Sequence, residues 1–183
     1  MLDGDPGSGH ALISRRRRAG HLAAVPDARA HPAFAKTEVL AFDALSLRQL
    51  YDLLRLRSAV FVVEQDCVYE DADGLDEGAL HVLTTDARGL VGYTRLLAPG
   101  TSHAEASAIG RVVTAPEARG EGLGRAVVTR SIGECRRRWP QSDILIHAQS
   151  YLLDFYAALG FVAEGEEFLE DGLPHFRMRL RPA

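Results

Sequence analysis

Alternating apolar and polar positions mark several short strands along this chain, and stretches with helical spacing separate them. Thr37–Phe42 is rich in β-forming residues and predicts a first strand. Ser46 and Gln49 then have the spacing of a capping box, and leucines recur at helical intervals as far as Arg57. These patterns predict a strand followed by a helix. An apolar run, Ala59–Gln65, comes next and ends in two polar residues.

The remainder of the chain predicts further strands around two more helices. An acidic loop over residues 70–78 precedes the segments 79–85 and 90–97, which we interpret as a hairpin. The later predicted elements are a strand over 108–114, a helix over 123–138, a strand over 143–148, a helix over 151–159 that Gly160 ends, and strands over 161–165 and 175–180. The order β-α-β-β-β-α-β-α-β-β is typical of a mixed α/β sheet with helices packed on it.

Length, composition and charge narrow the class of protein. A chain of 183 residues with 46% hydrophobic residues can form one domain with a sizeable core. The net charge of −4 argues against a general nucleic-acid binder, and no apolar run approaches the ~18 residues that span a membrane. Cys67 and Cys135 form neither a disulfide framework nor a metal-ligand cluster. We therefore expect a cytoplasmic protein without a metal site.

The first 36 residues differ from the rest of the chain. They are rich in Gly, Pro, Ala, Arg and His and show no sustained periodicity. We interpret residues 1–36 as a disordered extension or a misassigned start, and residues 37–183 as the folded domain. A basic arm at Arg15–Arg18 that contacts nucleic acid or a partner is the alternative.

The segment Glu117–Arg125, EARGEGLGR, carries three glycines at alternate positions in front of a predicted helix. Glycines let the backbone approach a ligand closely, and the N-terminal end of a helix attracts anions such as phosphate. A P-loop would need Lys and Ser or Thr after its last glycine, but Gly124 is followed by Arg and Ala. A dinucleotide fingerprint would need a further glycine where Val127 stands. The loop therefore indicates a phosphate site of another kind.

Two longer segments identify a family resemblance. IGRVVTAPEARGEGLGRAVV resembles the acetyl-CoA-binding motif of the GNAT acetyltransferases, and AQSYLLDFYAALGF resembles the next motif of that superfamily. The segments LRSAVFVVEQDCVYEDADGLDEGALHVL and EDGLPHFRM are similar to the ElaA-type branch. The resemblance covers about Thr37 to Leu180. It implies the GNAT acyl-CoA N-acyltransferase fold, a splayed central β-sheet flanked by helices.

The resemblance also implies where acetyl-CoA would bind. In the family the pyrophosphate rests on backbone N–H groups of the glycine loop, which here comprises Arg119, Gly120, Glu121, Gly122, Leu123, Gly124 and Arg125. The pantetheine arm lies beside the preceding strand, which implicates the backbone of Val112 and Val113. Gln149 stands where the family often has Asn, a departure that keeps an amide but changes its reach.

The implied reaction is direct transfer of acetyl from acetyl-CoA to an amine of a small molecule or a protein within a ternary complex. A backbone N–H near Val113 would polarise the thioester carbonyl. Tyr156 is the candidate general acid for the leaving thiolate, since a phenol stays protonated at neutral pH. The alternative for Tyr156 is a core tyrosine packed with Phe155 and Phe161.

The general base and the acceptor contacts are less defined by the sequence. Glu64 can face the cleft as a base or stand at a solvated strand end. His81 and His147 lie in apolar strands, where a core histidine is commoner than a catalytic one, and His81 is our histidine candidate for substrate contact. Arg111 can bind an anionic part of the acceptor or pair with Glu64. The acidic loop is interpreted as solvated, with attraction of a cationic acceptor as the alternative.

Two other functions remain open at this point. A GNAT-fold module that senses CoA or binds a partner without turnover would keep the glycine loop, although Tyr156 favours an enzyme. A relative that uses a longer acyl donor would differ in the volume of its pocket. The sequence leaves the acceptor and the oligomeric state open, and a dimer is compatible with it.

Overall fold

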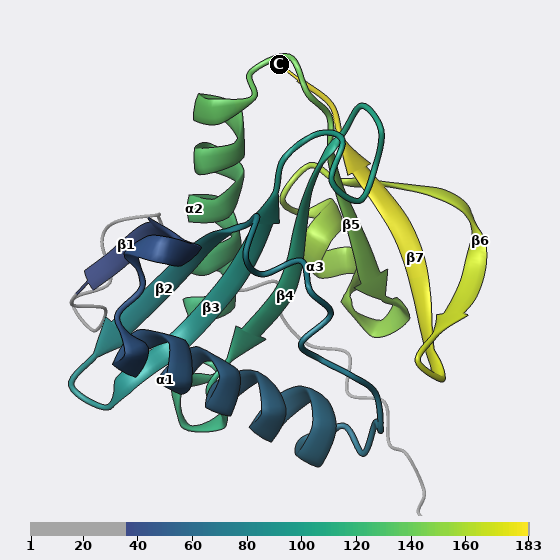
Figure 1. The fold of residues 1–183 in the computed structure, drawn as a ribbon. Coiled ribbons are helices and arrows are strands. Elements are labelled where there is room, and N and C mark those ends of the chain that lie inside the picture. The colour runs from purple at the N-terminus through teal and green to yellow at the C-terminus, as the bar shows by residue number, and fades with distance from the viewer. Residues whose placement is uncertain (1–35, 183) are drawn as a thin grey trace, which may run out of the picture. The chain divides into compact units, whose positions relative to one another are not determined.

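The elements of the fold follow the predicted order. In a computed structural model, which describes residues 36–182, the strands and helices follow one another along the chain as shown in Figure 1. Their bounds are β1 (Lys36–Ala41), α1 (Leu47–Arg57), β2 (Leu80–Asp86), β3 (Gly89–Leu97), β4 (Ser107–Thr114), α2 (Leu123–Arg138), β5 (Ile144–Gln149), α3 (Leu153–Ala157), β6 (Val162–Glu170) and β7 (Leu173–Leu180). The predicted mixed α/β class is confirmed.

The strands form a seven-stranded sheet in the order β1-β2-β3-β4-β5-β7-β6. Strands β1 to β4 make an antiparallel meander, and β5, β7 and β6 make a second antiparallel group. The two groups join where β4 pairs in parallel with β5, and this pairing covers the register Ser107↔Ile144 and Ala108↔Leu145. Figure 1 shows β4 and β5 diverging beyond that point. The second half of β4 therefore has no strand partner on its β5 side among the described residues.

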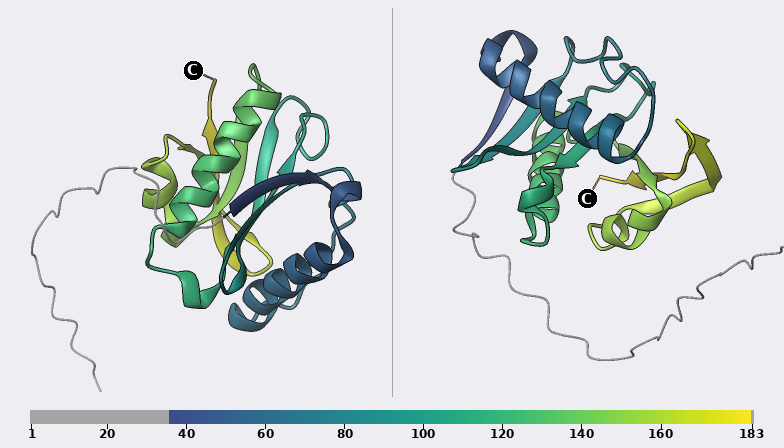
Figure 2. Two further views of the ribbon diagram at one scale, coloured as in Figure 1. Left: turned by 90° about the vertical axis from the view of Figure 1, so that its left-hand side faces the viewer. Right: turned by 90° about the horizontal axis from the view of Figure 1, so that it is seen from below.

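The helices cover both faces of the sheet. Figure 2 shows α1 and α2 on opposite faces of the half that contains β1 to β4. Leu53 and Leu56 of α1 are buried in a core cluster with strands β2, β3 and β4. Val128 and Cys135 of α2 are buried in a second cluster, which also holds residues of β5 and α3. Burial of these apolar side chains stabilises the packing of the helices on the sheet, by roughly 25 cal/mol for each Å² of apolar surface removed from water.

The predicted capping box at the start of α1 is present. The Ser46 side chain accepts a hydrogen bond from the backbone N–H of Gln49, and the Ser46 N–H donates to Gln49 Oε1 at 2.9 Å. At the other end the chain does not leave the helix as expected. Residues 58–64 continue it as a π-helix, with Gln65 N–H donating to the carbonyl of Val60 at 3.1 Å.

The strand end predicted at Glu64 is therefore wrong. The physical reason is that helical spacing buries Val60 in the core cluster beside Leu53 and Leu56, while Val63 stays 74% exposed. A strand over the same apolar run would place alternate residues on opposite faces of the sheet instead.

The predicted extension and its basic arm lie outside the described residues, apart from Lys36, which begins β1. Within residues 36–182, no helix has both the length and the apolar character required to cross a bilayer.

Candidate active site

Strand β4 departs from regular geometry at Arg111. The register with β3 pairs Tyr93 with Val113 and Arg95 with Gly110, so two residues of β4 stand opposite one residue of β3. Arg111 is the bulged residue and has a φ of 52°, a left-handed conformation that costs of order 1–3 kcal/mol for a residue other than glycine. The bulge bends β4 and accompanies its divergence from β5.

The Arg111 side chain is fixed by two carboxylates of the acidic loop. Its Nε donates to Asp71 Oδ1 at 2.8 Å, and a terminal guanidinium nitrogen donates to Asp73 Oδ2 at 3.1 Å. The alternative in which Arg111 pairs with Glu64 is therefore wrong. Arg111 is also one of the residues that line a cavity beside β4, so a substrate contact by Arg111 stays a prediction.

A cavity of about 450 Å³ occupies the region where β4 and β5 diverge. Its wall includes Val112 of β4, His147 and Gln149 of β5, and Tyr156 of α3. Polar and apolar groups alternate on this wall, as is usual for a small-molecule site. The predicted residues Val112, Gln149 and Tyr156 are thus brought together.

The glycine loop and the first turn of α2 form a separate predicted subsite. Gly120 and Gly122 have φ values of 81° and 79°, which only glycine adopts without strain. Gly122 is the N-cap of α2 and has no side-chain cap, so the N–H groups of Leu123, Gly124 and Arg125 lack intrahelical partners. A Cβ at Gly122 would meet no atom within 4 Å, so the loop backbone is open to a ligand.

Glu64 lies against Arg119 and not in the cavity wall. The two side chains form a bidentate pair, with N–O distances of 2.6 and 2.9 Å, and both are about 40% exposed. The hydrogen bonds from Arg119 hold the pKa of Glu64 below its usual value. A carboxylate that is stabilised in its charged form is a poor general base. The general-base role predicted for Glu64 therefore does not fit the structure.

Tyr156 is almost fully buried, with its ring edge-on to Phe155 and Phe161 at centroid distances of 4.9 and 5.9 Å. It therefore packs as a core tyrosine while also lining the cavity. Burial raises the pKa of Tyr156, so the phenol stays protonated over the whole physiological range. Beside it, the Gln149 amide donates to Gln65 Oε1 at 3.3 Å. Both residues belong to the cavity wall, so contacts with a ligand stay a prediction.

His81 has no exposed surface. Its Nδ1 lies 2.8 Å from the Tyr93 hydroxyl and its Nε2 lies 3.0 Å from the Asp76 carbonyl oxygen. Burial lowers the pKa of His81, which keeps the ring neutral. With both nitrogens bonded inside the core, His81 cannot contact a substrate, and this candidate is corrected.

A buried ionic cluster is the main feature that sequence reasoning missed. Arg57, with no exposed side-chain surface, donates to Asp71 and Asp76, each at 2.8 Å. Arg95 donates to Asp73 at 2.6 Å and shares Asp76 at 3.0 Å. The acidic loop is therefore not simply solvated, because these carboxylates fix it over the sheet. The available signal was an arginine within the apolar segment 90–97, which required a partner elsewhere.

This cluster predicts a loss of stability in acid. Burial alone would raise the pKa of Asp73, but the hydrogen bonds from Arg95 and the Leu75 N–H outweigh it and lower the pKa to about 2. The pKa of Asp73 in the folded protein therefore lies below the value of ~3.9 for an unfolded chain. Its contribution to stability is fully present above the unfolded pKa and is lost as the pH falls through the folded pKa. Thermal melting should therefore show this contribution disappearing as the pH falls from about 5 toward 2. In Asp73→Asn, the melting temperature should depend less on pH over this range. An unchanged dependence of melting temperature on pH below 5 would contradict the lowered pKa of Asp73.

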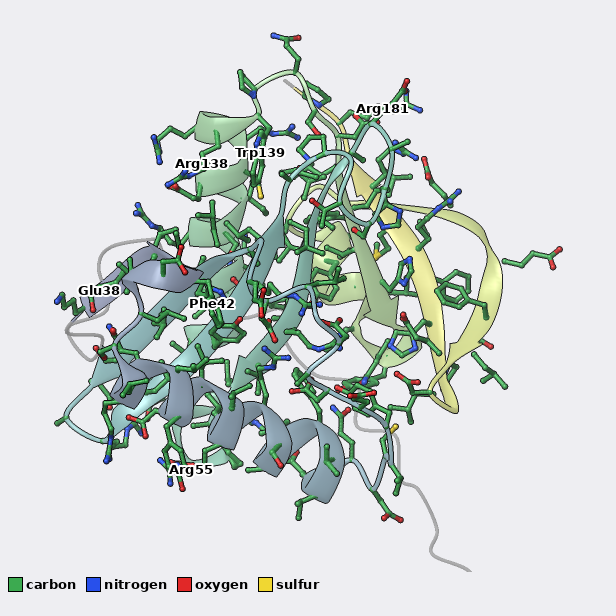
Figure 3. All side chains as sticks on the ribbon, viewed as in Figure 1. Glu38, Phe42, Arg55, Arg138, Trp139 and Arg181 are labelled. Carbon is green, nitrogen blue, oxygen red and sulfur yellow. The ribbon has the colours of Figure 1, made fainter. Side chains whose placement is uncertain are left out.

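The arginines at the end of α2 lie far from the glycine loop. Figure 3 shows Arg138 and Trp139 at the end of α2 opposite its N-terminus. Arg137 and Arg138 both pair with Glu134 at 2.6 Å. These contacts explain the basic run without a ligand.

Comparisons with known proteins agree with this architecture. Residues 46–182 match the family model described as an acetyltransferase (GNAT) domain. The chain is 40% identical to protein ElaA of Escherichia coli over 141 residues, which is 76% of this chain and 92% of ElaA. It is also 41% identical to a UPF0039 protein of Synechocystis sp., covering 76% of this chain and 91% of that protein.

Solved structures show the same relationship. An acyl-CoA N-acyltransferase from Pseudomonas aeruginosa superposes with a TM-score of 0.75 and 39% identity, covering 79% of this chain and 98% of that one. The crystal structure of Escherichia coli ElaA also gives a TM-score of 0.75, with 38% identity over 80% of this chain and 99% of ElaA. The chain therefore belongs to the GNAT acetyltransferase family, within which it is similar to ElaA.

Proposed function

We propose that this protein transfers acetyl from acetyl-CoA to an amine acceptor by direct attack in a ternary complex. The observation that carries the proposal is the cavity at the divergence of β4 and β5, with Tyr156 in its wall. Family membership supports acyl transfer in general. The acetyl donor, the amine acceptor and the residue roles are the parts that we add.

The proposed cofactor site fits the chemistry of CoA. The pyrophosphate would lie at the positive end of α2, on the N–H groups of the loop from Arg119 to Arg125. The pantetheine arm carries two amides, and these can pair with backbone groups of β4 around Val112, on the side of the strand that β5 leaves uncovered, whereas Val113 is paired with Tyr93 of β3. Gln149 is the side-chain amide available on the facing strand.

The reaction assigns one task to each group. The amine nitrogen attacks the thioester carbon, the C–S bond breaks, and CoA leaves as a thiolate. A backbone N–H near Val113 stabilises the oxyanion that forms as the amine attacks. Tyr156 donates a hydrogen bond to the departing sulfur and supplies its proton. The proton released by the amine needs a base.

Gly122→Val tests the proposed pyrophosphate subsite. Valine at a φ of 79° is strained by more than the 1–2 kcal/mol typical of left-handed residues, and the loop must deform to relieve it. We expect the acetyl-CoA dissociation constant from calorimetry to rise about tenfold or more, since 1.4 kcal/mol is tenfold. Gly133→Val is the matched control, because Gly133 is an exposed residue within the same helix and outside the left-handed region. Equal affinities for both variants would place the phosphate elsewhere.

The same calorimetry tests the donor. We expect wild-type protein to bind acetyl-CoA in preference to NADH and ATP, and a concentration of 100 times the dissociation constant should stabilise it by about 2.7 kcal/mol. A titration with longer acyl-CoA esters compares acetyl with bulkier donors. Absence of acetyl-CoA binding would remove the proposed donor. Binding without thiol release across an amine panel would favour a CoA-sensing module.

A further inference from the structure

His147 of β5 lies in the cavity wall on the same face as Gln149. Residues two apart in a strand point the same way, with Cα atoms roughly 6–7 Å apart. His147 is therefore one strand repeat from the amide that we assign to the pantetheine arm. Its side chain is 33% exposed, so part of the ring is accessible to a ligand.

The ring is held by a carboxylate and by aromatic side chains. His147 Nδ1 lies 3.2 and 3.1 Å from the two carboxylate oxygens of Glu170, the last residue of β6. The Phe168 ring meets it edge-on at a centroid distance of 5.1 Å, and His103 lies 5.9 Å away on the loop before β4. Phe168 in turn stacks on His175 at 6.1 Å. Contacts on several sides restrict rotation of the imidazole.

The pairing with Glu170 sets the chemistry of the ring. A carboxylate only accepts hydrogen bonds, so Nδ1 carries the proton in the neutral imidazole and Nε2 is the acceptor. Nε2 has no hydrogen-bond partner within the part of the chain that the structure describes. The hydrogen bond from His147 lowers the pKa of Glu170, so its carboxylate stays charged and can stabilise an imidazolium.

Several other ionisable groups near the cavity are held in ion pairs. Asp71 and Asp73 are bonded to the buried arginines, and Glu64 is bonded to Arg119. On the neighbouring strand β7, Arg177 pairs with Glu164 at 3.5 Å and Arg179 pairs with Glu164 and Asp143. Titratable residues of the cavity wall outside these ion pairs include His103, His175, Glu170 and Asp171.

We propose that His147 is the general base for the acceptor amine and that Glu170 is its positioning residue. Nε2 takes a proton from the bound ammonium, which frees the nitrogen lone pair to attack the thioester carbon. Tyr156 protonates the sulfur as the C–S bond breaks, and the second proton lost by the nitrogen restores the Tyr156 phenol through solvent. The amine subsite then lies between β5 and the β6–β7 turn, with the Glu170 charge attracting a cationic amine. This inference rests on the proposed acetyl transfer.

The test compares His147→Gln and Glu170→Gln with wild type, using ethylamine, benzylamine and hydroxylamine as probes. Thiol release gives kcat/KM for each amine from pH 6 to 10, and calorimetry gives the acetyl-CoA affinity. We expect His147→Gln to lower kcat/KM for the two alkylamines by about 10²–10³-fold at neutral pH, without changing acetyl-CoA affinity. The deficit, which is the ratio of wild-type to variant kcat/KM, should be smaller with hydroxylamine, because hydroxylamine is largely unprotonated at neutral pH. For the two alkylamines the deficit should also become smaller at alkaline pH. Glu170→Gln should give a smaller deficit of the same kind.

A purely structural role for the pair would not produce this pattern. Glu166→Gln is the matched control, because Glu166 is an exposed residue of the same strand β6, and it should leave rates and pH profile unchanged. Equal loss by His147→Gln for all three amines at every pH, or no loss, would overturn the base assignment while leaving acetyl transfer intact. A wild-type protein that releases no thiol with any probe would overturn the proposed function itself.

Discussion

Tyr156→Phe is expected to lower kcat by about 10²–10⁴-fold and to leave acetyl-CoA affinity unchanged. That range is what a positioned general acid typically contributes. The substitution removes a single hydroxyl and keeps the ring, so the edge-on contacts with Phe155 and Phe161 remain. Because burial raises the pKa of Tyr156, the phenol does not titrate where amines react, and the deficit should be the same at every pH. Steady-state thiol release with a fixed amine measures it.

The pH dependence separates this effect from that of His147. His147→Gln should change the shape of the pH profile, whereas Tyr156→Phe should shift the whole profile downward. Tyr51→Phe is the control for loss of a tyrosine hydroxyl, since Tyr51 is 64% exposed on α1 and does not line the cavity. If Tyr156→Phe retains wild-type kcat, Tyr156 is a packing residue and the departing thiolate takes its proton from solvent.

Arg57→Met should cost about 3–5 kcal/mol of unfolding free energy, the largest stability effect that we predict. Removing one partner of a buried ion pair leaves the others charged and uncompensated. Arg57 is fully buried and pairs with both Asp71 and Asp76, so methionine replaces its aliphatic stem but none of its charge. The expected fall in melting temperature is roughly 6–20 °C, at 2–4 °C per kcal/mol for a chain of this size.

An exposed arginine on the same helix provides the control. Arg48 pairs with Asp52 at 3.0 Å but its side chain is 82% exposed, and exposed pairs of this spacing contribute about 0.3–0.5 kcal/mol. Arg48→Met should therefore be nearly neutral in chemical denaturation. Should Arg57→Met prove equally mild, water must reach the Asp71 and Asp76 carboxylates, and the cluster would not be a structural anchor for the acidic loop.

The sequence was informative wherever the signal is local. Helix α1 begins at its capping box, and α2 begins directly after the glycines, because caps and left-handed turns depend on residues within a few positions of each other. Alternation predicted strands β2 to β4 to within a residue or two for the same reason. The π-helical continuation of α1 escaped prediction because an apolar run of seven residues satisfies both strand and helix patterns.

The ionic contacts of the site could not be predicted, since they join distant residues. Glu64 and Arg119 are 55 positions apart, and Arg111 and Asp71 are 40 apart. Composition shows that such charges exist but not which ones meet. Glu170 likewise reaches His147 across the sheet order, where β7 separates β6 from β5. The partner of each charge therefore depends on the fold as a whole.

The divergence of β4 from β5 has a mechanical consequence for the sheet. Two residue pairs connect its two antiparallel groups directly, and farther along the seam backbone groups of β4 face the cavity. In the proposed complex, an extended donor lying along β4 would pair with the open edge of the sheet as well as react. Binding of the donor would therefore add to the few strand contacts that join the two groups, and release of the product would remove that addition again.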